Sequence, residues 1–396
     1  ELTTFLLRFF IPQIVLSGVG AIATAVLHAR RQFVVPAAAP IGNTVVLVAF
    51  LLVFAVVAGP DPGLDLSMGE QLLLAAGGTL GVAAFVAIPT VALVRGGFRF
   101  APRTPSRGGD LSHLLRLSGW ATVQHLGAGL LLAAALVVGG GVEGGVVAFQ
   151  VGWVFFQAPY GVLAQPINTV ILPEISRDAA EGDLPALAAG LRWALDSMAL
   201  LLVPLGAAGA VFAVPFLESL AFGAATEGEG GTLLGAAVAS LSVGLLGYGA
   251  FLMLARAAYA LGDSRTPAIV SLASALGGVA LMVVVGSQVT GTALVVLLGL
   301  AHSLAFTAGA VALGVVLHRR LGEQVWPRVL VPVSACTLVV AAAASAALAR
   351  WSPDGRVATL VAVAVVGGVA AAALMGLVRL LHLAPHDPRP TRRTTA

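Results

Sequence analysis

Residues 157–183 read QAPYGVLAQPINTVILPEISRDAAEGD, an apolar run that ends in an acidic patch containing one arginine. Prolines recur in it at seven-residue spacing, at Pro159, Pro166 and Pro173. A proline inside a helix removes a backbone hydrogen bond and kinks the helix. In a bilayer this is tolerated only where neighbouring helices, polar side chains or water satisfy the freed carbonyl groups. We therefore predict a bent transmembrane helix beside a cavity, with the prolines as its bend or gate, followed by a polar loop. Four polar side chains in the run can satisfy the freed groups: Gln157, Gln165, Asn168 and Thr169.

The composition indicates a helical membrane protein. Hydrophobic residues make up 59% of the 396 residues and charged residues only 10%, whereas a soluble domain carries about 25% charged residues. The apolar runs are long rather than alternating, which is typical of α-helical spans and not of a β-barrel. We expect an all-α polytopic membrane protein. Its one cysteine, Cys336, excludes an intrachain disulfide.

Windows of about 20 apolar residues define the spans of such a protein. They predict eleven spans, at residues 5–28, 41–59, 72–93, 119–138, 146–171, 191–214, 235–261, 267–286, 293–317, 329–348 and 357–381.

The arginines are distributed unevenly between the connections. Cytoplasmic loops carry an excess of basic residues, and alternate connections together with the C-terminal tail hold seventeen of the 21 basic residues, all of which are arginine. Three others, Arg8, Arg350 and Arg356, lie on the opposite side, and Arg256 lies inside a predicted span. This pattern predicts a cytoplasmic C-terminus and places Glu1 outside.

A weak internal repeat suggests two lobes. Gly18-Val19-Gly20-Ala21 and Gly247-Tyr248-Gly249-Ala250 are each followed by a basic loop, a Pro-Ala pair and an apolar run. Both copies run in the same direction, and parallel repeats of this kind place two helical lobes about an axis along the membrane normal. Only three spans of the first lobe are present, so we expect about three further helices before Glu1.

The sequence offers no enzymatic site and no cofactor site. It contains no metal-ligand spacing, phosphate-binding loop or Ser/His/Asp arrangement. Apart from Asp196, near a span end, no carboxylate lies well inside a predicted span, as a proton or sodium antiporter would need. His125 and His302 lie within spans and can be functional or structural. Arg256 either snorkels to lipid headgroups or attracts a phosphate at the mouth of a cavity.

Three stretches of the chain resemble the MurJ (MviN) lipid II flippase family, within the multidrug/oligosaccharidyl-lipid/polysaccharide exporter superfamily. The first runs from Phe10-Ile11-Pro12-Gln13 through Arg30-Arg31 to Pro36-Ala37. The second is Pro159-Tyr160-Gly161-Val162-Leu163-Ala164 with Leu172-Pro173-Glu174-Ile175-Ser176-Arg177. The third is Arg256-Ala257-Ala258-Tyr259-Ala260-Leu261-Gly262-Asp263-Ser264-Arg265-Thr266-Pro267.

The resemblance implies a fold of fourteen helices, of which this chain would hold the fourth to the fourteenth. Residues 1–93 would be the C-terminal half of an N-lobe, 94–118 a cytoplasmic linker with an amphipathic turn, and 119–317 a six-helix C-lobe. Residues 318–381 would add two C-terminal helices, and 382–396 a disordered cytoplasmic tail.

The resemblance also implies a substrate path. Candidate cavity residues are Gln150, Trp153, Gln157, Gln165, Asn168 and Arg256, with Arg30, Arg31 and Arg265 at the cytoplasmic mouth. The alternative for the polar residues among these is a role as polar contacts between helices. Aligned on the Pro-Tyr-Gly motif, a cavity arginine of the family falls at Val154. The acids of a sodium site described for some members have no counterpart in 267–317.

The function implied is a flippase of the bacterial plasma membrane that carries lipid II, an undecaprenyl pyrophosphate glycopeptide, to the outer leaflet by alternating access. Its expected partners are this lipid, membrane lipids and cell-wall synthesis proteins, with no nucleic acid. Three alternatives stay open. One is a drug/cation antiporter, another is a flippase for a different polyprenyl-linked oligosaccharide, and the third is a degenerate flippase that acts as a scaffold for cell-wall synthesis.

Overall fold

A computed structural model describes residues 2–30, 32, 34–59, 62–63, 65–98, 108–221, 229–351 and 355–383, with only the backbone at 108–114, 116 and 117. Every regular element in these residues is a helix. Ten helices are long and apolar enough to cross a membrane, or eleven when one bent pair is counted as a span. Each of the eleven predicted spans falls on one of them, which confirms the predicted fold class.

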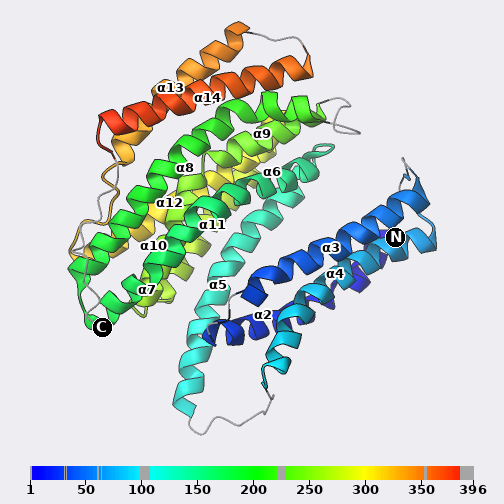
Figure 1. The fold of residues 1–396 in the computed structure, drawn as a ribbon, viewed down its shortest axis with the longest axis horizontal. Coiled ribbons are helices and arrows are strands. Elements are labelled where there is room, and N and C mark those ends of the chain that lie inside the picture. The colour runs from blue at the N-terminus through cyan, green and yellow to red at the C-terminus, as the bar shows by residue number, and fades with distance from the viewer. Residues whose placement is uncertain are drawn as a thin grey trace. The chain divides into compact units, whose positions relative to one another are not determined.

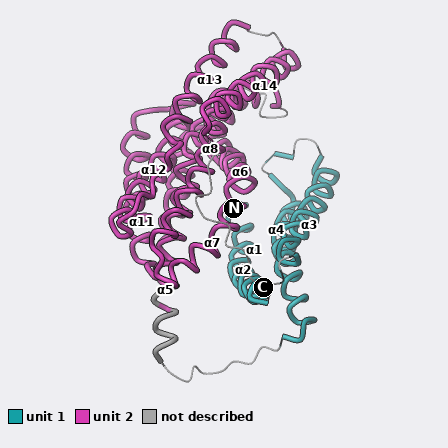
Figure 2. The backbone as a smooth tube through the Cα atoms, turned by 60° about the vertical axis from the view of Figure 1, so that its left-hand side comes forward, with its two compact units in different colours: residues 1–106 teal, residues 107–396 magenta. Residues whose placement is uncertain are grey.

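The chain divides into two compact units, residues 1–106 and 107–396, coloured separately in Figure 2. The first contains α1 (Leu2–Phe10), α2 (Gln13–Ala29), α3 (Val34–Ala58) and α4 (Met68–Arg95). Helix α4 packs along α3 and also against α1 and α2. It begins with a capping box, in which Ser67 and Glu70 each accept a hydrogen bond from the backbone amide of the other.

Pro12 interrupts the first span between α1 and α2. Because this break frees a carbonyl group inside the bilayer, a partner is needed from elsewhere. The Thr79 hydroxyl group on α4 donates to the carbonyl oxygen of Phe9 at 3.1 Å, and Gln13 Nε2 donates to Thr79 Oγ1 at 3.1 Å. The break is therefore fixed to the neighbouring helix.

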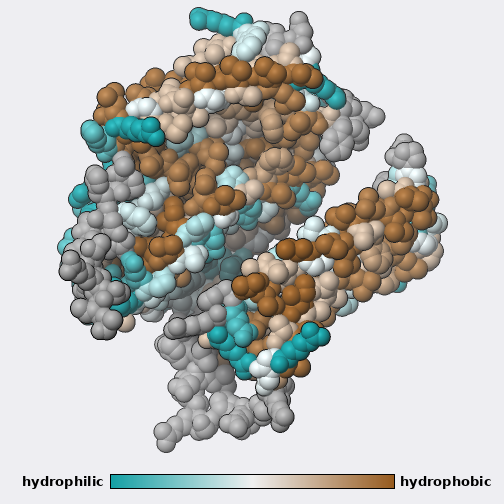
Figure 3. Space-filling view, in the orientation of Figure 1, coloured by the Kyte–Doolittle hydropathy of each residue, from teal (hydrophilic) through white to brown (hydrophobic). Residues whose placement is uncertain are grey.

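The second unit holds the remaining helices, which Figure 1 shows as a bundle with α13 and α14 beside α8. Its helices run in the order α5 (Gly108–Gly139), α6 (Gly145–Pro159), η1 (Tyr160–Ala164), α7 (Gln165–Glu181), α8 (Leu184–Leu220), α9 (Gly230–Ser242), α10 (Leu245–Ala260), α11 (Arg265–Gly286), α12 (Gly291–Leu321), α13 (Leu330–Trp351) and α14 (Arg356–Leu380). The main core of this unit contains Phe149, Phe156, Met198 and Leu241, all less than 2% exposed. In Figure 3, apolar side chains cover much of the visible surface of each unit, as expected for surfaces that contact lipid.

The predicted single span at 235–261 is wrong in one respect. The structure breaks it into α9 and α10, which are bent by 44°. Ser303 on α12 lies at the break, and its hydroxyl group is within 3.0 Å of the carbonyl oxygen of Ser240 and 3.1 Å of that of Leu241. The sequence Ser242-Val243-Gly244 contains no proline, so the signal that predicted the irregularity between residues 157 and 183 is missing here.

Small residues allow these helices to approach closely. A Cβ atom added at Gly244 would lie 2.7 Å from the Cα atom of Ser303, and one added at Gly247 would lie 2.9 Å from the Cα atom of Thr307. Small residues at helix contacts are typical of membrane bundles, in which close backbone packing replaces hydrophobic burial as the driving force. The contact between α10 and α12 therefore depends on glycine.

We expect Gly247→Val to destabilise the protein by about 1–3 kcal/mol, the usual cost of overpacking. Gly277→Val is the matched control, because a Cβ atom at Gly277 would meet no atom within 4 Å. The measurement is thermal unfolding of the purified protein in detergent. Equal unfolding temperatures for the two variants would show that α10 and α12 can separate without cost.

Candidate functional site

The span that contains the three prolines is one continuous helical segment, Gly145–Glu181. It contains a π turn at Tyr160–Ala164, directly after Pro159 and directly before Gln165 and Pro166. The backbone amide of Gln165 donates to the carbonyl oxygen of Tyr160, an i to i+5 hydrogen bond that takes up one more residue than an α turn. Such π turns are rare and occur frequently at functional sites. The predicted irregularity is therefore present, in the form of a widened turn.

The polar loop predicted after this span is wrong. Helix α7 continues through Pro173 to Glu181, and Gly182, at φ +74°, ends it in the left-handed conformation. Asp183 then caps α8, accepting a hydrogen bond from the backbone amide of Ala186 at 3.0 Å. The connection between the two helices is thus two residues long.

Four polar side chains meet at the π turn. The Tyr160 hydroxyl group donates to Gln165 Oε1 at 3.0 Å, and Asn168 Nδ2 donates to the Tyr160 hydroxyl oxygen at 3.3 Å. Arg256, on α10, extends Nη2 to Gln165 Oε1 at 3.5 Å. We call Tyr160, Gln165, Asn168 and Arg256 the π-turn cluster.

The members of this cluster differ in exposure. Asn168 is only 1% exposed, and its Oδ1 atom has no hydrogen-bond partner among the residues that the structure describes. Gln165 is exposed and Arg256 half-buried. The partner of the guanidinium group in this contact is a neutral amide, so the contact leaves the positive charge of Arg256 uncompensated.

An aromatic cluster adjoins the π turn. Tyr160 packs edge-on against Tyr248 at 5.0 Å between ring centroids, and Gln157 hydrogen-bonds to Tyr248. Trp153 and Phe306 each lie within 5 Å of the His302 ring, at 4.9 and 4.8 Å. His302 is 3% exposed. It packs within this cluster, and its Nδ1 atom has no hydrogen-bond partner among the residues that the structure describes.

The structure brings together most of the predicted cavity residues. Gln165, Asn168 and Arg256 belong to the π-turn cluster. Trp153 and Gln157 each contact Tyr248, which packs against Tyr160 of that cluster. Gln150 is exposed on α6 and takes part in neither cluster. Val154, where the family resemblance places an arginine, is 65% exposed on the same helix.

Sequence reasoning missed Tyr160 and Tyr248 as members of these clusters. The signal was available, since Tyr160 stands in the Pro-Tyr-Gly motif and Tyr248 in the Gly-Tyr-Gly-Ala repeat.

The predicted mouth residues are engaged within their own units. In the first unit, Arg30 donates to the carbonyl oxygen of Gly96 at 3.2 Å and lies over the Phe98 ring at 5.5 Å. In the second unit, Arg265 lies 5.7 Å over the ring of Trp120 on α5. Arg31 lies outside the residues that the structure describes.

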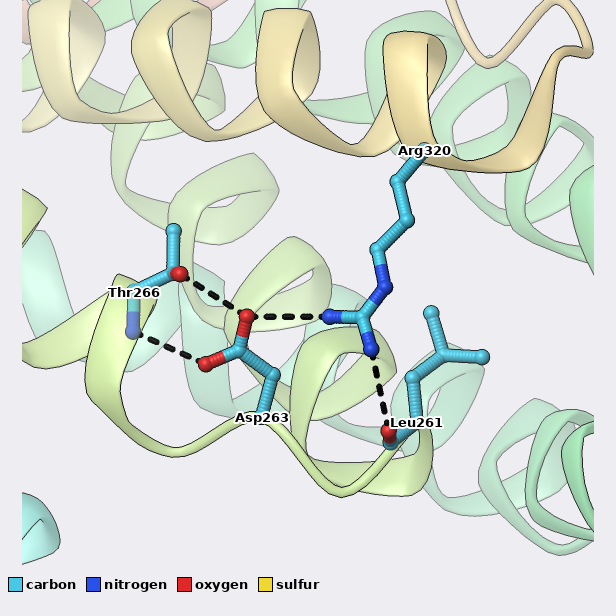
Figure 4. Close-up of polar contacts among 4 residues, drawn as sticks. All are labelled: Leu261, Asp263, Thr266 and Arg320. Atoms are coloured by element: carbon cyan, nitrogen blue, oxygen red, sulfur yellow. Dashed lines mark hydrogen bonds and ion pairs between the residues drawn. The ribbon is translucent and has the colours of Figure 1, made fainter.

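An ion pair closes the turn between α10 and α11 (Figure 4). Arg320 on α12 donates to Asp263 Oδ2 at 2.9 Å and to the carbonyl oxygen of Leu261 at 3.4 Å. Asp263 also accepts hydrogen bonds from the amide and the hydroxyl group of Thr266, at 3.0 and 2.8 Å. Burial alone would raise the pKa of the Asp263 carboxyl group, but the bonds from Thr266 and the charge of Arg320 hold that pKa below its usual value.

An apolar groove runs between α8, α13 and α14. Its volume is about 470 Å³, and its walls include Leu163 from the π turn, Phe212, Ala371 and Arg379. A second apolar groove, of about 570 Å³, lies between α8, α10, α12 and α13. Ala207 and Val211 on α8 and Thr337 and Ala341 on α13 line both grooves, so the two grooves adjoin along these helices. Leu163 lines the first groove and belongs to the π turn, so this groove adjoins the π-turn cluster.

The family model described as Lipid II flippase MurJ matches residues 1–380. A probable lipid II flippase MurJ from Rhizobium tropici is 25% identical over 361 residues, which cover 89% of this chain and 65% of that protein. The lipid II flippase MurJ of Burkholderia cenocepacia is 23% identical, over 67% of this chain and 51% of its own length. A probable lipid II flippase MurJ from Synechocystis is 26% identical, over 67% and 50%. The chain therefore spans between 50% and 65% of the length of these relatives.

The fold is also similar to a solved structure of a lipid II flippase MurJ in an inward closed conformation. The TM-score is 0.69 at 17% sequence identity, and the match covers 95% of this chain and 74% of that chain. At this identity the similarity concerns the fold alone.

Asp263→Asn should remove the ion pair and lower the stability by roughly 1 kcal/mol, because Arg320 is 44% exposed and solvent screens the pair. Since the pKa of Asp263 is lower in the folded state, its contribution is complete above the unfolded pKa, near 4, and is lost as the pH falls further. Thermal unfolding should therefore separate wild type and variant equally from pH 8 to 5, and less below about pH 4. Arg319→Gln is the control. A difference that already disappears at pH 6 contradicts this assignment.

Proposed function

Because the chain belongs to the lipid II flippase MurJ family, whose model covers residues 1–380, we propose that the protein moves a lipid-linked peptidoglycan precursor of the lipid II type across the bacterial plasma membrane. Movement is from the inner to the outer leaflet, by alternating access, and no covalent bond changes. The substrate has an apolar polyprenyl tail, a diphosphate and a glycopeptide head. In the second unit, Arg256 suits the diphosphate and an apolar groove suits the tail.

The proposal depends mainly on the neutral surroundings of the Arg256 guanidinium group. This arginine lies within a helix of a membrane bundle, and the groups that it contacts, Gln165 Oε1 at 3.5 Å and the Tyr160 hydroxyl group, are neutral. An uncompensated guanidinium group in such a setting attracts a phosphate, which it can bind through two parallel charge-assisted hydrogen bonds. We assign the diphosphate to Arg256, and Gln157 and Trp153 to the adjoining headgroup path.

The groove between α8, α13 and α14 suits the tail. Its walls are almost entirely apolar, and Leu163 brings it to the π turn that carries Tyr160 and Gln165. A tail in this groove can stay in contact with hydrocarbon while the headgroup crosses beside α6 and α7. Each methylene group kept in apolar surroundings contributes about 0.8 kcal/mol. Contacts with cell-wall synthesis proteins stay a prediction.

The general test is depletion of the protein in cells, followed by an assay that labels lipid II only in the outer leaflet. Lipid II should accumulate in the inner leaflet. A normal rate of arrival at the outer leaflet, in cells without a second flippase, excludes the proposal.

Arg256→Ala should lower the affinity of the purified protein for undecaprenyl diphosphate about 10- to 100-fold, the equivalent of one charge-assisted hydrogen bond. The affinity of Arg256→Lys should lie between those of the wild type and Arg256→Ala, because lysine keeps the positive charge but lacks the planar guanidinium group. Arg356→Ala, at the exposed start of α14, is the control. Unchanged binding by Arg256→Ala would return this arginine to a snorkelling role.

Ala371→Trp should obstruct the tail groove, which Ala371 lines. Loss of contact for as few as two methylene groups weakens binding of a polyprenyl substrate about tenfold. Ala372→Trp is the matched control. Ala372 follows Ala371 in the sequence, but it is exposed and lines no part of that groove. The measurement is complementation of the depleted cells, with outer-leaflet lipid II as the readout. Equal transport by both variants would place the tail elsewhere.

A further inference from the structure

We propose that Tyr160 and Asn168 are positioning residues, which hold Arg256 for the diphosphate through Gln165, and that the π turn exists to make this arrangement possible. The inference rests on the proposed function and adds three residues to its site. It starts from the geometry of the turn.

The contact between Tyr160 and Gln165 depends on the π turn. In an uninterrupted α-helix, residues five apart point about 140° away from each other, because each residue turns the chain by about 100°. A π turn accommodates an extra residue within one turn, which brings positions five apart back towards the same side. The hydrogen bond of 3.0 Å between the Tyr160 hydroxyl group and Gln165 Oε1 is the consequence.

The same widening aligns Asn168 with Tyr160, eight residues away. Asn168 Nδ2 donates to the Tyr160 hydroxyl oxygen at 3.3 Å. A hydroxyl group has one hydrogen, so Tyr160, which accepts from Asn168, can give its own hydrogen to Gln165. The three side chains thus form a directed chain of hydrogen bonds.

The chain of hydrogen bonds fixes the orientation of the Gln165 amide group. Gln165 Oε1 accepts from both Tyr160 and Arg256, so a flipped amide would point its own NH₂ group at two donors. Gln165 is exposed, and without the buried Tyr160 and Asn168 its side chain would be free to rotate. The Arg256 guanidinium group is therefore held on one side by an oriented neutral acceptor, and its remaining N–H groups can bind a phosphate.

Asn168 adds a second sign that the arrangement is functional. It is 1% exposed, and its Oδ1 atom has no partner among the residues described. Unsatisfied buried acceptors are few in native proteins and each calls for an explanation. An apolar side chain at this position would avoid the unsatisfied group but could not direct the hydrogen of Tyr160 towards Gln165. The interaction with Tyr160 explains why a buried amide occupies this position.

The test uses Tyr160→Phe, which keeps the ring against Tyr248 and removes only the hydroxyl group. We expect the Kd of the purified protein for undecaprenyl diphosphate to rise about three- to tenfold, the loss of one hydrogen bond. The transport rate at saturating substrate should stay within twofold of wild type. Asn168→Leu should likewise raise the Kd and leave the transport rate unchanged. Ser176→Ala is the control and should change neither quantity, because the Ser176 hydroxyl group donates to the carbonyl oxygen of Leu172 within α7.

A double-mutant cycle separates positioning from a general structural effect. In an Arg256→Ala background, Tyr160→Phe should have no further effect on the Kd, because the group that it positions is absent. Gln165→Glu should weaken binding as much as Arg256→Ala, because a carboxylate at this position neutralises the guanidinium group.

The outcomes distinguish this inference from the proposed function. If Arg256→Ala leaves binding unchanged, the diphosphate assignment itself is wrong. If Arg256→Ala weakens binding but Tyr160→Phe has no effect, or an effect that simply adds to that of Arg256→Ala, the positioning inference alone is overturned.

Discussion

Hydrocarbon cannot hydrogen-bond to a peptide group, and this constraint decides where the helices of this protein can be interrupted. The structure has interruptions within three spans, and each is satisfied by a specific contact. Thr79 donates to the carbonyl oxygen freed at Phe9, and Ser303 lies within hydrogen-bonding distance of two carbonyl oxygens at the break between α9 and α10. In the third span, the backbone itself closes the π turn from Gln165 to Tyr160. The interruptions are thus defined positions rather than flexible joints.

The side chains that satisfy these breaks are short and reach their targets only where helices are nearly in contact. Glycine provides that closeness. A Cβ atom added at Gly244 would lie 2.7 Å from the Cα atom of Ser303, the residue that covers the neighbouring break. A Cβ atom at Gly299 would lie 2.8 Å from the Cβ atom of Ser240. Close packing and backbone satisfaction therefore depend on the same residues, which gives a structural reason for part of the high glycine content.

The sequence was sufficient to predict the features that depend on local composition. Hydropathy located every span, because burial in hydrocarbon is a property of 20-residue windows. The prolines marked an irregularity between residues 157 and 173, but a proline removes a hydrogen bond without determining whether the helix kinks or widens, so the π turn was not predictable. Hydropathy also ended the predicted span at residue 171, before the end of the helix. It reports where the chain leaves the hydrocarbon, whereas α7 continues as a helix to Glu181.

Features that depend on long-range contacts could not be predicted from one sequence. Gln165 and Arg256 are separated by 91 residues, and nothing in either local pattern indicates that they meet. The break after Ser242 is similar, because its partner Ser303 lies in another helix. Gln150 illustrates the opposite error. It shares its residue type and its span with Gln157 and Gln165, yet it is exposed on α6 and belongs to neither cluster.

For the proposed transport of a diphosphate, a neutral partner suits Arg256 better than an acidic one would. Gln165 leaves the positive charge of Arg256 available to a phosphate, and a charge-assisted contact with a phosphate contributes about 1.5–3 kcal/mol. Breaking a buried ion pair would cost about 3–5 kcal/mol, and the phosphate could not displace it. A transport site has to bind its substrate well enough to admit it and weakly enough to release it. In the proposed site, Gln165 orients the guanidinium group without neutralising it, so the remaining N–H groups can take up a phosphate and release it while the contact with Gln165 stays in place.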